Sequence, residues 1–388
     1  MSGKTVPLQK HKTASLPEQK LLYFRFWQSA SGFWRGPSAW PSWLLCGSLI
    51  LIVLAQLLVQ YRLNYWNRDF FDAIGQKNAE ALKFQALLFL PLVGTSITLA
   101  IASVWGRMTT QRKWREWLTT HLIDYWLAND HFHHLNQDGD GHENPEYRIA
   151  EDARVATDAP IDLALGLLSS VLTAFVFVDI LWEVGGNISF TTFGLTVWIP
   201  GYLVAGVIAY SMLVTTAMMI VGHPLVGVAQ RQMQAEAEFR AAANLLRETG
   251  EGMVTGSEPE QRRTLWRALE VVLARWRDLC WQLMRMTLIS HCNTLLAPVV
   301  ALVLCVPKYL AGTMSLGELT QAAAAFTAVQ GAFNWLVDNY LRLADWTSSA
   351  NRVATLLLAI DALERGEQAV HLAQTGQGPT TAIKQAQS

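Results

Sequence analysis

Charged residues are scarce in this chain. Lys, Arg, Asp and Glu make up 16% of the 388 residues, whereas hydrophobic residues make up 51%. A pair of soluble domains would carry more charge on its surface, so the composition argues against that class of protein. The net charge of −1 gives no sign of a nucleic-acid partner. Long apolar runs and 16 Trp residues instead indicate a polytopic membrane protein.

Several chemical signatures are also missing. There is no G-x-x-x-x-G-K-[ST] P-loop, so we do not expect the chain to cradle ATP phosphates by that mechanism. There is no Ser/His/Asp set, and the four Cys residues lack disulfide or zinc spacing. The polar N-terminus lacks a signal-peptide core. The His-rich tract 131–143 lacks a rigid ligand set, so we expect a loop. No catalytic residue, metal or cofactor is therefore expected in this chain.

Six apolar segments are each close to the ~20 residues that cross a bilayer. Basic residues are concentrated before the first segment, between the second and third, and between the fourth and fifth, which places both termini in the cytoplasm. We therefore expect a cytoplasmic segment at 1–39, a six-helix membrane domain at 40–345, and a cytoplasmic segment at 346–388 with a disordered end. The six segments lie at about 40–60, 84–105, 161–182, 197–221, 287–311 and 315–342.

Two long connections, at about 106–160 and 222–286, have amphipathic helical patterns. Each contains a break rich in Gly, the first near 138–141 and the second near 250–259. The simplest arrangement extends the membrane helices into the cytoplasm as two helical hairpins. The predicted fold is therefore all-α, with six membrane helices and two cytoplasmic hairpins.

The sixth segment carries Gln330, Asn334 and Asp338 at every fourth position, so they form one polar stripe on a helix. Such a stripe faces a protein interior or a water-filled cavity rather than lipid. One interpretation is interhelical hydrogen bonding. The other is a substrate pathway, in which Asp338 would be the ionisable member.

Three carboxylates are candidates for proton coupling or gating. Asp179 and Glu183 are four residues apart near the outer end of the third segment, and Glu318 opens the sixth. Two neighbouring carboxylates raise the pKa of at least one, which suits proton uptake and release. The alternative is that Asp179 and Glu183 are simply hydrated at the membrane surface. Glu318, Asp338 and His291 are weaker candidates for this role than Asp179 and Glu183, and His291 is more typical of a packed, hydrogen-bonded residue.

The two hairpins carry a further set of charged residues. Asn144 can cap a helix that Pro145 opens, and Arg148 follows one turn later. In the second hairpin, Arg247, Glu248 and Glu251 lie on a charged helix and turn. Each set is either a solvated helix end or a coupling surface for an ATPase subunit.

Several strings in this order resemble the membrane domain shared by peroxisomal-type ATP-binding-cassette transporters and the SbmA/BacA-type peptide transporters. The second hairpin departs from the family pattern at 252–258, where an apolar-aromatic run with a Gly-Gly turn is usual. The strings are LNYWNRDFFDAIGQKN (63–78), NPEYRIAEDARVATD (144–158), AEFRAAANLLRETGEGMVTGSE (237–258) and LGELTQAAAAFTAVQGAFNWLVDNYLRLADW (316–346).

The resemblance implies an exporter-type (type IV) membrane domain in a bacterial inner membrane. It implies a homodimer that moves peptides or other bulky solutes, such as cobalamin or acyl compounds, by alternating access. The energy would come from a proton gradient or from a separate or missing ATPase domain, because ATP-hydrolysing members continue into a domain with a P-loop. The alternative function is a non-transporting scaffold or receptor that recruits a soluble partner through its hairpins.

Overall fold

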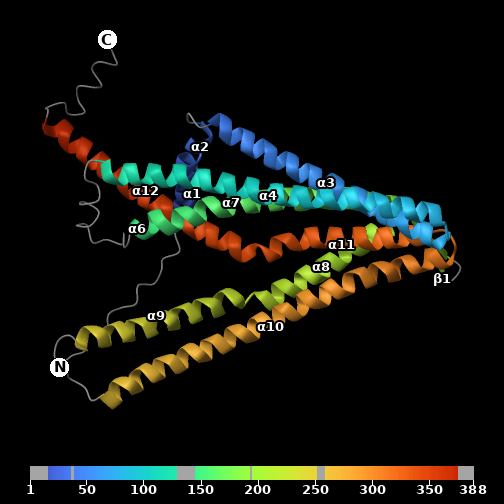
Figure 1. Ribbon diagram of the computed structural model, residues 1–388. Coiled ribbons are helices and arrows are strands. Elements are labelled where there is room, and N and C mark those ends of the chain that lie inside the picture. The colour runs from blue at the N-terminus through green and yellow to red at the C-terminus, as the bar shows by residue number, and fades with distance from the viewer. Residues whose placement is uncertain (1–15, 36–38, 129–144, 193–194, 251–257, 375–388) are drawn as a thin grey trace, which may run out of the picture. The chain divides into compact units, whose positions relative to one another are not determined.

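The structure is a computed structural model that describes residues 16–35, 39–128, 145–192, 195–250 and 258–374 (Figure 1). It is almost entirely helical. The helices are α1 (Leu16–Ala30), α2 (Gly32–Arg35), α3 (Ala39–Gly75), α4 (Ala79–Leu127), α6 (Pro145–Tyr147), the π-helical turn η2 (Arg148–Asp152), α7 (Ala153–Gly185), α8 (Tyr202–Gly222), α9 (Leu225–Gly250), α10 (Glu258–Leu310), α11 (Leu316–Asp338) and α12 (Tyr340–Gln374).

Five helical stretches among the described residues are long and apolar enough to cross a membrane. They overlap the first five segments predicted from the sequence. The helix of the predicted sixth segment, α11, has 23 residues but is not among the five. Its many Ala and polar residues lower its hydropathy. The five stretches are Ala39–Gly75, Ala79–Leu127, Pro145–Gly185, Tyr202–Leu246 and Arg262–Leu310.

Two of these helices are much longer than the hydrocarbon core of a bilayer is thick. Helix α10 has 53 residues and α4 has 49. At 1.5 Å per residue, α10 is about 80 Å long, against about 30 Å for the hydrocarbon core. Helix α9 lies beside the first part of α10 (Figure 1). They flank the break predicted near 250–259, which falls largely outside the described residues, as does the break at 138–141.

Two local predictions were wrong. An antiparallel hairpin of β1 (Asn187–Thr192) and β2 (Leu195–Pro200) precedes α8, so the fold is not purely helical and the fourth membrane helix begins at Tyr202 rather than near 197. Gly201 separates strand from helix with a φ of 60°, a conformation that glycine adopts without strain. The predicted helix 315–342 is also interrupted, because Asn339 forms a turn between α11 and α12.

The chain divides into two compact units. The first comprises residues 1–56, 94–169 and 339–388, and the second comprises 57–93 and 170–338. In the first unit, α1 and α2 from the N-terminal segment pack with α4, α7 and α12 around one apolar cluster. Its most deeply buried members include Phe26, Trp114, Leu118, Val353 and Leu357.

The second unit has its own core, in which α11 packs against α7, α8 and α10. Phe326 and Val329 of α11 are fully buried beside Leu203 and Val207 of α8. Ala322 and Ala325 are also fully buried, and such small residues let helix backbones approach closely. The Ala-rich run of α11 is therefore its packing face.

Candidate functional site

The exposed face of α11 differs from that of the five helices that are apolar enough to cross a membrane. Over residues 316–332, which are all described, α11 exposes no large hydrophobic side chain. Its intermediate or exposed small and polar positions recur at helical spacing on one face, at Thr320, Ala324, Thr327, Gly331, Asn334 and Asp338. Beyond residue 332, Phe333 and Leu336 are exposed on another face of the helix. The five helices that can cross a membrane expose large apolar residues, among them Leu51 on α3, Leu87 on α4, Phe175 on α7, Leu213 on α8 and Leu295 on α10.

The structure separates the three residues of the predicted stripe. Gln330 is 4% exposed and lies in the packing of the second unit, whereas Asn334 is half-buried and Asp338 is exposed. From Asp338 and Asn334 towards the N-terminus of α11, the polar face thus continues through Gly331 and Thr327 rather than through Gln330. A face of small and polar residues is poorly suited to lipid but suits a cavity or a second protein.

Buried amides mark the other side of α11. Gln321 is fully buried, and neither of its side-chain amide atoms has a hydrogen-bond partner among the described residues. The side-chain amide of Asn64 of α3 donates a hydrogen bond to the backbone carbonyl oxygen of Gln321 at 3.2 Å. The Asn64–Gln321 hydrogen bond between α3 and α11 fits the interpretation of interhelical hydrogen bonding that the sequence left open for segment 315–342. The residues predicted to form such bonds did not include Asn64 or Gln321.

An ionic cluster joins the end of α3 to the start of α11. Asp72 accepts a hydrogen bond from the Gly317 N–H at 2.8 Å, and Arg68 lies 3.4 Å from Glu318. Glu318 and Ser315 form a capping box, in which each side chain accepts from the other's backbone N–H at 3.0 Å. A Cβ on Gly317 would lie 2.1 Å from the Arg68 carbonyl oxygen, so this close approach requires glycine.

The other two predicted gating carboxylates lie on the exposed side of α7. Glu183 accepts a hydrogen bond from the Tyr65 hydroxyl at 3.3 Å. Asp179, one turn earlier, has no hydrogen-bond or ion-pair partner among the residues that the structure describes. Helix α7 therefore does not pair the two carboxylates with each other, and both are exposed. His291 of α10 is exposed as well.

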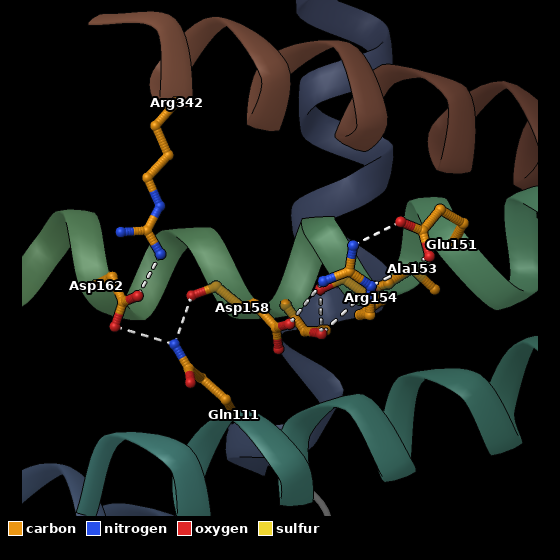
Figure 2. Close-up of polar contacts among 8 residues, drawn as sticks. Gln111, Glu151, Ala153, Arg154, Asp158, Asp162 and Arg342 are labelled. Atoms are coloured by element: carbon orange, nitrogen blue, oxygen red, sulfur yellow. Dashed lines mark hydrogen bonds and ion pairs between the residues drawn. The ribbon is translucent and has the colours of Figure 1, made fainter. Parts of the chain in front are cut away.

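Asp162 of α7 is the centre of a polar junction in the first unit (Figure 2). It accepts hydrogen bonds from Arg342 of α12 and, at 3.0 Å, from Gln111 of α4. Arg107 of α4 lies 3.5 Å away. Gln111 also donates to the Asp158 carbonyl at 2.9 Å. The junction links three helices that are distant in sequence.

Two more ion pairs fasten α12 within this unit. Arg352 donates to both carboxylate oxygens of Asp152 in η2, at 2.7 and 2.9 Å. Arg25 of α1 does the same to Asp361, at 2.6 and 2.7 Å, and Tyr125 donates to Asp361 at 2.7 Å. Burial alone would raise the pKa of Asp361, but these hydrogen bonds and the Arg25 charge hold it below its ordinary value.

Of the coupling residues predicted in the first hairpin, only Arg148 lies near these ion pairs in the described structure. Arg148 is half-buried at the start of η2, and the π-helical turn directs Asp152 inward. The next turn is charged. Arg154 donates to Glu151 at 3.1 Å, which lowers the pKa of Glu151, while burial raises the pKa of Asp158 against the opposing charge of Arg154 (Figure 2).

The remaining predicted residues lie largely beyond what the structure describes. Asn144 and Glu251 are outside the described residues, as is the His-rich tract 131–143. Arg247 and Glu248 belong to α9, but their side chains are not described. Within the described residues, no group of three His, Cys, Asp or Glu side chains could hold a metal ion.

Comparison with known proteins identifies the family. Residues 37–310 match the model of ABC transporter transmembrane region 2. The chain is 28% identical over 314 residues to the inner membrane ABC transporter ATP-binding protein YddA of Escherichia coli, covering 79% of this chain and 56% of that protein. It is 21% identical over 337 residues to ABC transporter D family member 2, chloroplastic, of Arabidopsis thaliana, covering 87% and 46%.

A third relative is the human lysosomal cobalamin transporter ABCD4, 22% identical over 333 residues, which cover 81% of this chain and 52% of that protein. The chain thus spans about half the length of the curated relatives it matches. The family match covers well over half of the chain, and five helices can cross a membrane. The chain is therefore a multi-pass membrane protein that belongs to the ABC transporter transmembrane region 2 family.

Proposed function

We propose that this chain is the permease of a transporter and that α11 is a sixth membrane helix, which completes a type IV exporter-type membrane domain. The observation that supports this is the exposed face of α11. Lipid favours large apolar side chains, which the other five helices expose and α11 does not between residues 316 and 332. The face from Thr320 to Asp338 then lines an aqueous path, and Asn334 and Asp338 contact the solute.

The path requires a second wall, which we assign to a second copy of the chain. Helix α9 packs extensively along α10, and no other described element packs along α9 to a comparable extent. This hairpin exposes Met233, Leu245, Trp266 and Trp276. Apolar side chains in water favour a protein partner. A homodimer with both termini in the cytoplasm of a bacterial inner membrane would cover them.

The proposed cargo is a bulky solute, with peptides first and cobalamin or acyl compounds next. This range rests on the resemblance to SbmA/BacA-type and peroxisomal-type transporters and on the relative named as a cobalamin transporter. A face of small side chains leaves room for such a solute. Alternating access would open this face to one side of the membrane at a time.

The two ends of the path would be controlled separately. The Arg68–Glu318 ion pair and the Asp72–Gly317 hydrogen bond form a latch at the α3–α11 end. Asp179 and Glu183 lie on exposed α7 surface and are the proposed proton-coupling carboxylates, each acting separately. The hairpin residues Asn144, Arg148, Arg247, Glu248 and Glu251 would contact an ATPase partner, as the names of the relatives suggest.

The test is uptake by proteoliposomes that contain the purified chain. A fluorescently labelled cationic peptide and cyanocobalamin serve as probes, with either an imposed proton gradient or ATP and a separately purified ATPase. Asn334→Ala and Asp338→Ala should lower the initial uptake rate about tenfold, the effect of losing one good polar contact. Leu213→Ala, on the apolar exposed face of α8, is the matched control and should not.

A second candidate function is a scaffold that recruits a soluble partner through the hairpins. The exposed apolar residues of α9 and α10 favour it as well as they favour a dimer. The two functions differ in one result. If Asn334→Ala and Asp338→Ala, inserted at the parental level, take up both probes at the parental rate, the pathway assignment is wrong and the scaffold remains.

A further inference from the structure

Two cavities occupy the first unit where α2 wedges between the start of α3 and the middle of α4. One, called the polar cavity because charged residues are in its lining, has a volume of about 500 Å³, and its lining includes Phe33 of α2, Ser42 of α3 and Trp117 of α4. The other is almost wholly apolar and has a volume of about 310 Å³, and its lining includes Trp34 of α2, Leu49 of α3 and Trp114 of α4. The same three elements therefore wall both cavities.

The polar cavity contains charges of both signs. Lys113, Glu116 and Asp124 line it on one face of α4, together with Thr120 and His121. Within the described part of the chain, Lys113, Glu116 and Asp124 form no ion pair with the protein. Burial and the charge of Arg25 lower the pKa of His121, which favours its neutral form. A ligand that carries both a cation and an anion would therefore complement this lining.

The apolar cavity has the opposite character. Trp27 and Trp114 line it along with Leu49, Ile50 and Leu165. Water in such a space would find few of the polar partners that an ordered water needs. Its volume is about ten times the share of one water molecule in the liquid, which is enough for a stretch of hydrocarbon chain.

The position of the cavities along the helices matches the edge of a membrane. A Cβ on Gly106 of α4 would lie 2.8 Å from Leu49 Cδ2, so these residues are level with each other. Gly106 directly follows the second predicted apolar segment. Trp40 and Trp43, near the start of α3, are 75% and 61% exposed, as tryptophans of the membrane interface are.

Along both α3 and α4, the apolar cavity thus lies nearer the membrane centre than the polar one. It reaches Ile50 on α3, whereas the polar cavity reaches only to Ser42 on α3 and extends to Asp124 on α4. This is the order of the two parts of a lipid, with the chain inward and the headgroup outward.

We propose that the two cavities together bind one phospholipid whose headgroup carries both a phosphate and a primary ammonium group. The acyl chain enters between the tryptophans of the apolar cavity. The ammonium donates to Glu116 and Asp124, and the phosphate accepts from Lys113 and from the Ser42 or Thr120 hydroxyl. A choline headgroup lacks the N–H donors, and a glycerol headgroup lacks the cation. The site is separate from the α11 face and does not depend on transport.

The test is native mass spectrometry of the purified, delipidated full chain. Phosphatidylethanolamine, phosphatidylcholine and phosphatidylglycerol with identical acyl chains are titrated separately. We expect one phosphatidylethanolamine molecule to bind about tenfold more tightly than either of the others, the effect of one charge-assisted hydrogen bond. Equal binding of the three lipids overturns the proposal without any variant.

Variants then locate the site. Glu116→Gln with Asp124→Asn should remove the preference for phosphatidylethanolamine, and Lys113→Ala should weaken the binding of all three lipids. Glu80→Gln and Lys83→Ala, exposed at the other end of α4, are the matched controls and should change nothing. Ala164→Phe, which fills the apolar cavity, should weaken binding of every lipid.

The variants keep the proposal falsifiable even if one of them folds poorly. Lys113, Glu116 and Asp124 are exposed in the first unit, so we expect parental melting temperatures for changes at these positions. A preference for phosphatidylethanolamine that survives the Glu116→Gln, Asp124→Asn double variant places the lipid elsewhere. Binding that survives Ala164→Phe unchanged shows that the acyl chain does not use the apolar cavity.

Discussion

The Arg352–Asp152 pair allows a sharp prediction because its two members are buried very differently. The Asp152 side chain is 2% exposed and the Arg352 side chain is 45% exposed. Arg352→Met therefore leaves a carboxylate inside the first unit without its two hydrogen bonds. Asp152→Asn leaves an arginine that still reaches water and donates to the Ser348 and Ser349 hydroxyls, at 2.8 and 2.9 Å.

The magnitudes follow from this asymmetry. Removing one partner of a buried ion pair costs about 3 to 5 kcal/mol. We expect about 3 kcal/mol for Arg352→Met, because Arg352 is itself half-exposed and Arg148 is nearby. Burial lowers the pKa of Arg148, and the charge of Asp152 offsets part of that lowering. Asp152→Asn should cost about 1 kcal/mol, the value of an ordinary hydrogen bond.

The assay is the free energy of unfolding in mixed micelles of a mild detergent and dodecyl sulfate, followed by tryptophan fluorescence. The double variant should cost less than the sum of the single variants, because the unpaired carboxylate no longer exists. The reasoning is refuted if Asp152→Asn costs more than Arg352→Met, or if the two costs simply add.

Three further predictions concern other contacts. Gly317→Ala should destabilise the second unit by about 1 to 3 kcal/mol, because the new Cβ would clash with the Arg68 carbonyl oxygen. The control is Gly331→Ala on the same helix, whose Cβ would meet nothing within 4 Å and should not destabilise the unit. Thermal unfolding of the two variants distinguishes these outcomes. The lowered pKa of Asp361 means that its stabilising effect is complete above the unfolded pKa of about 4 and is lost as pH falls through the lower folded value. Unfolding measured between pH 6 and pH 2 should therefore show an acid-labile contribution that Asp361→Asn removes. Tyr65→Phe should leave the folded protein intact but remove the hydrogen bond to Glu183. If Glu183 takes part in proton coupling, the pH profile of uptake should change in this variant. An unchanged profile would count against that role.

Hydropathy and helical periodicity predicted most of the helices because both act locally along the chain. The cytoplasmic placement of the termini, which rests on the basic residues, stays a prediction. Apolar runs identified the five helices that can cross a membrane, and amphipathic patterns predicted their extensions. The β1–β2 hairpin was missed because the apolar residues of β2 run directly into those of α8. The turn at Asn339 was missed because the helical pattern of 315–342 continues across it without Gly or Pro.

The candidate site was predictable only where its residues are close in sequence. The Ser315–Glu318 capping box can be read from the four residues S-L-G-E, although Glu318 was assigned to gating alone. The Arg352–Asp152 pair spans 200 residues, so no spacing could indicate it. The periodicity of Gln330, Asn334 and Asp338 is real, but helix packing decides that Gln330 is buried and that Thr327 and Gly331 complete the exposed face.

The central claim is that the α11 face meets water inside the membrane, and thiol labelling tests it most directly. Single cysteines at Thr327, Gly331 and Asn334 are introduced after Cys46, Cys280, Cys292 and Cys305 are replaced by alanine or serine. Cysteines at Leu213 and Leu295, exposed on α8 and α10, provide the lipid-facing comparison. We predict rapid labelling of the α11 positions by a charged, membrane-impermeant thiol reagent and slow labelling of the comparison positions. Equal, slow labelling of all five positions would contradict the pathway.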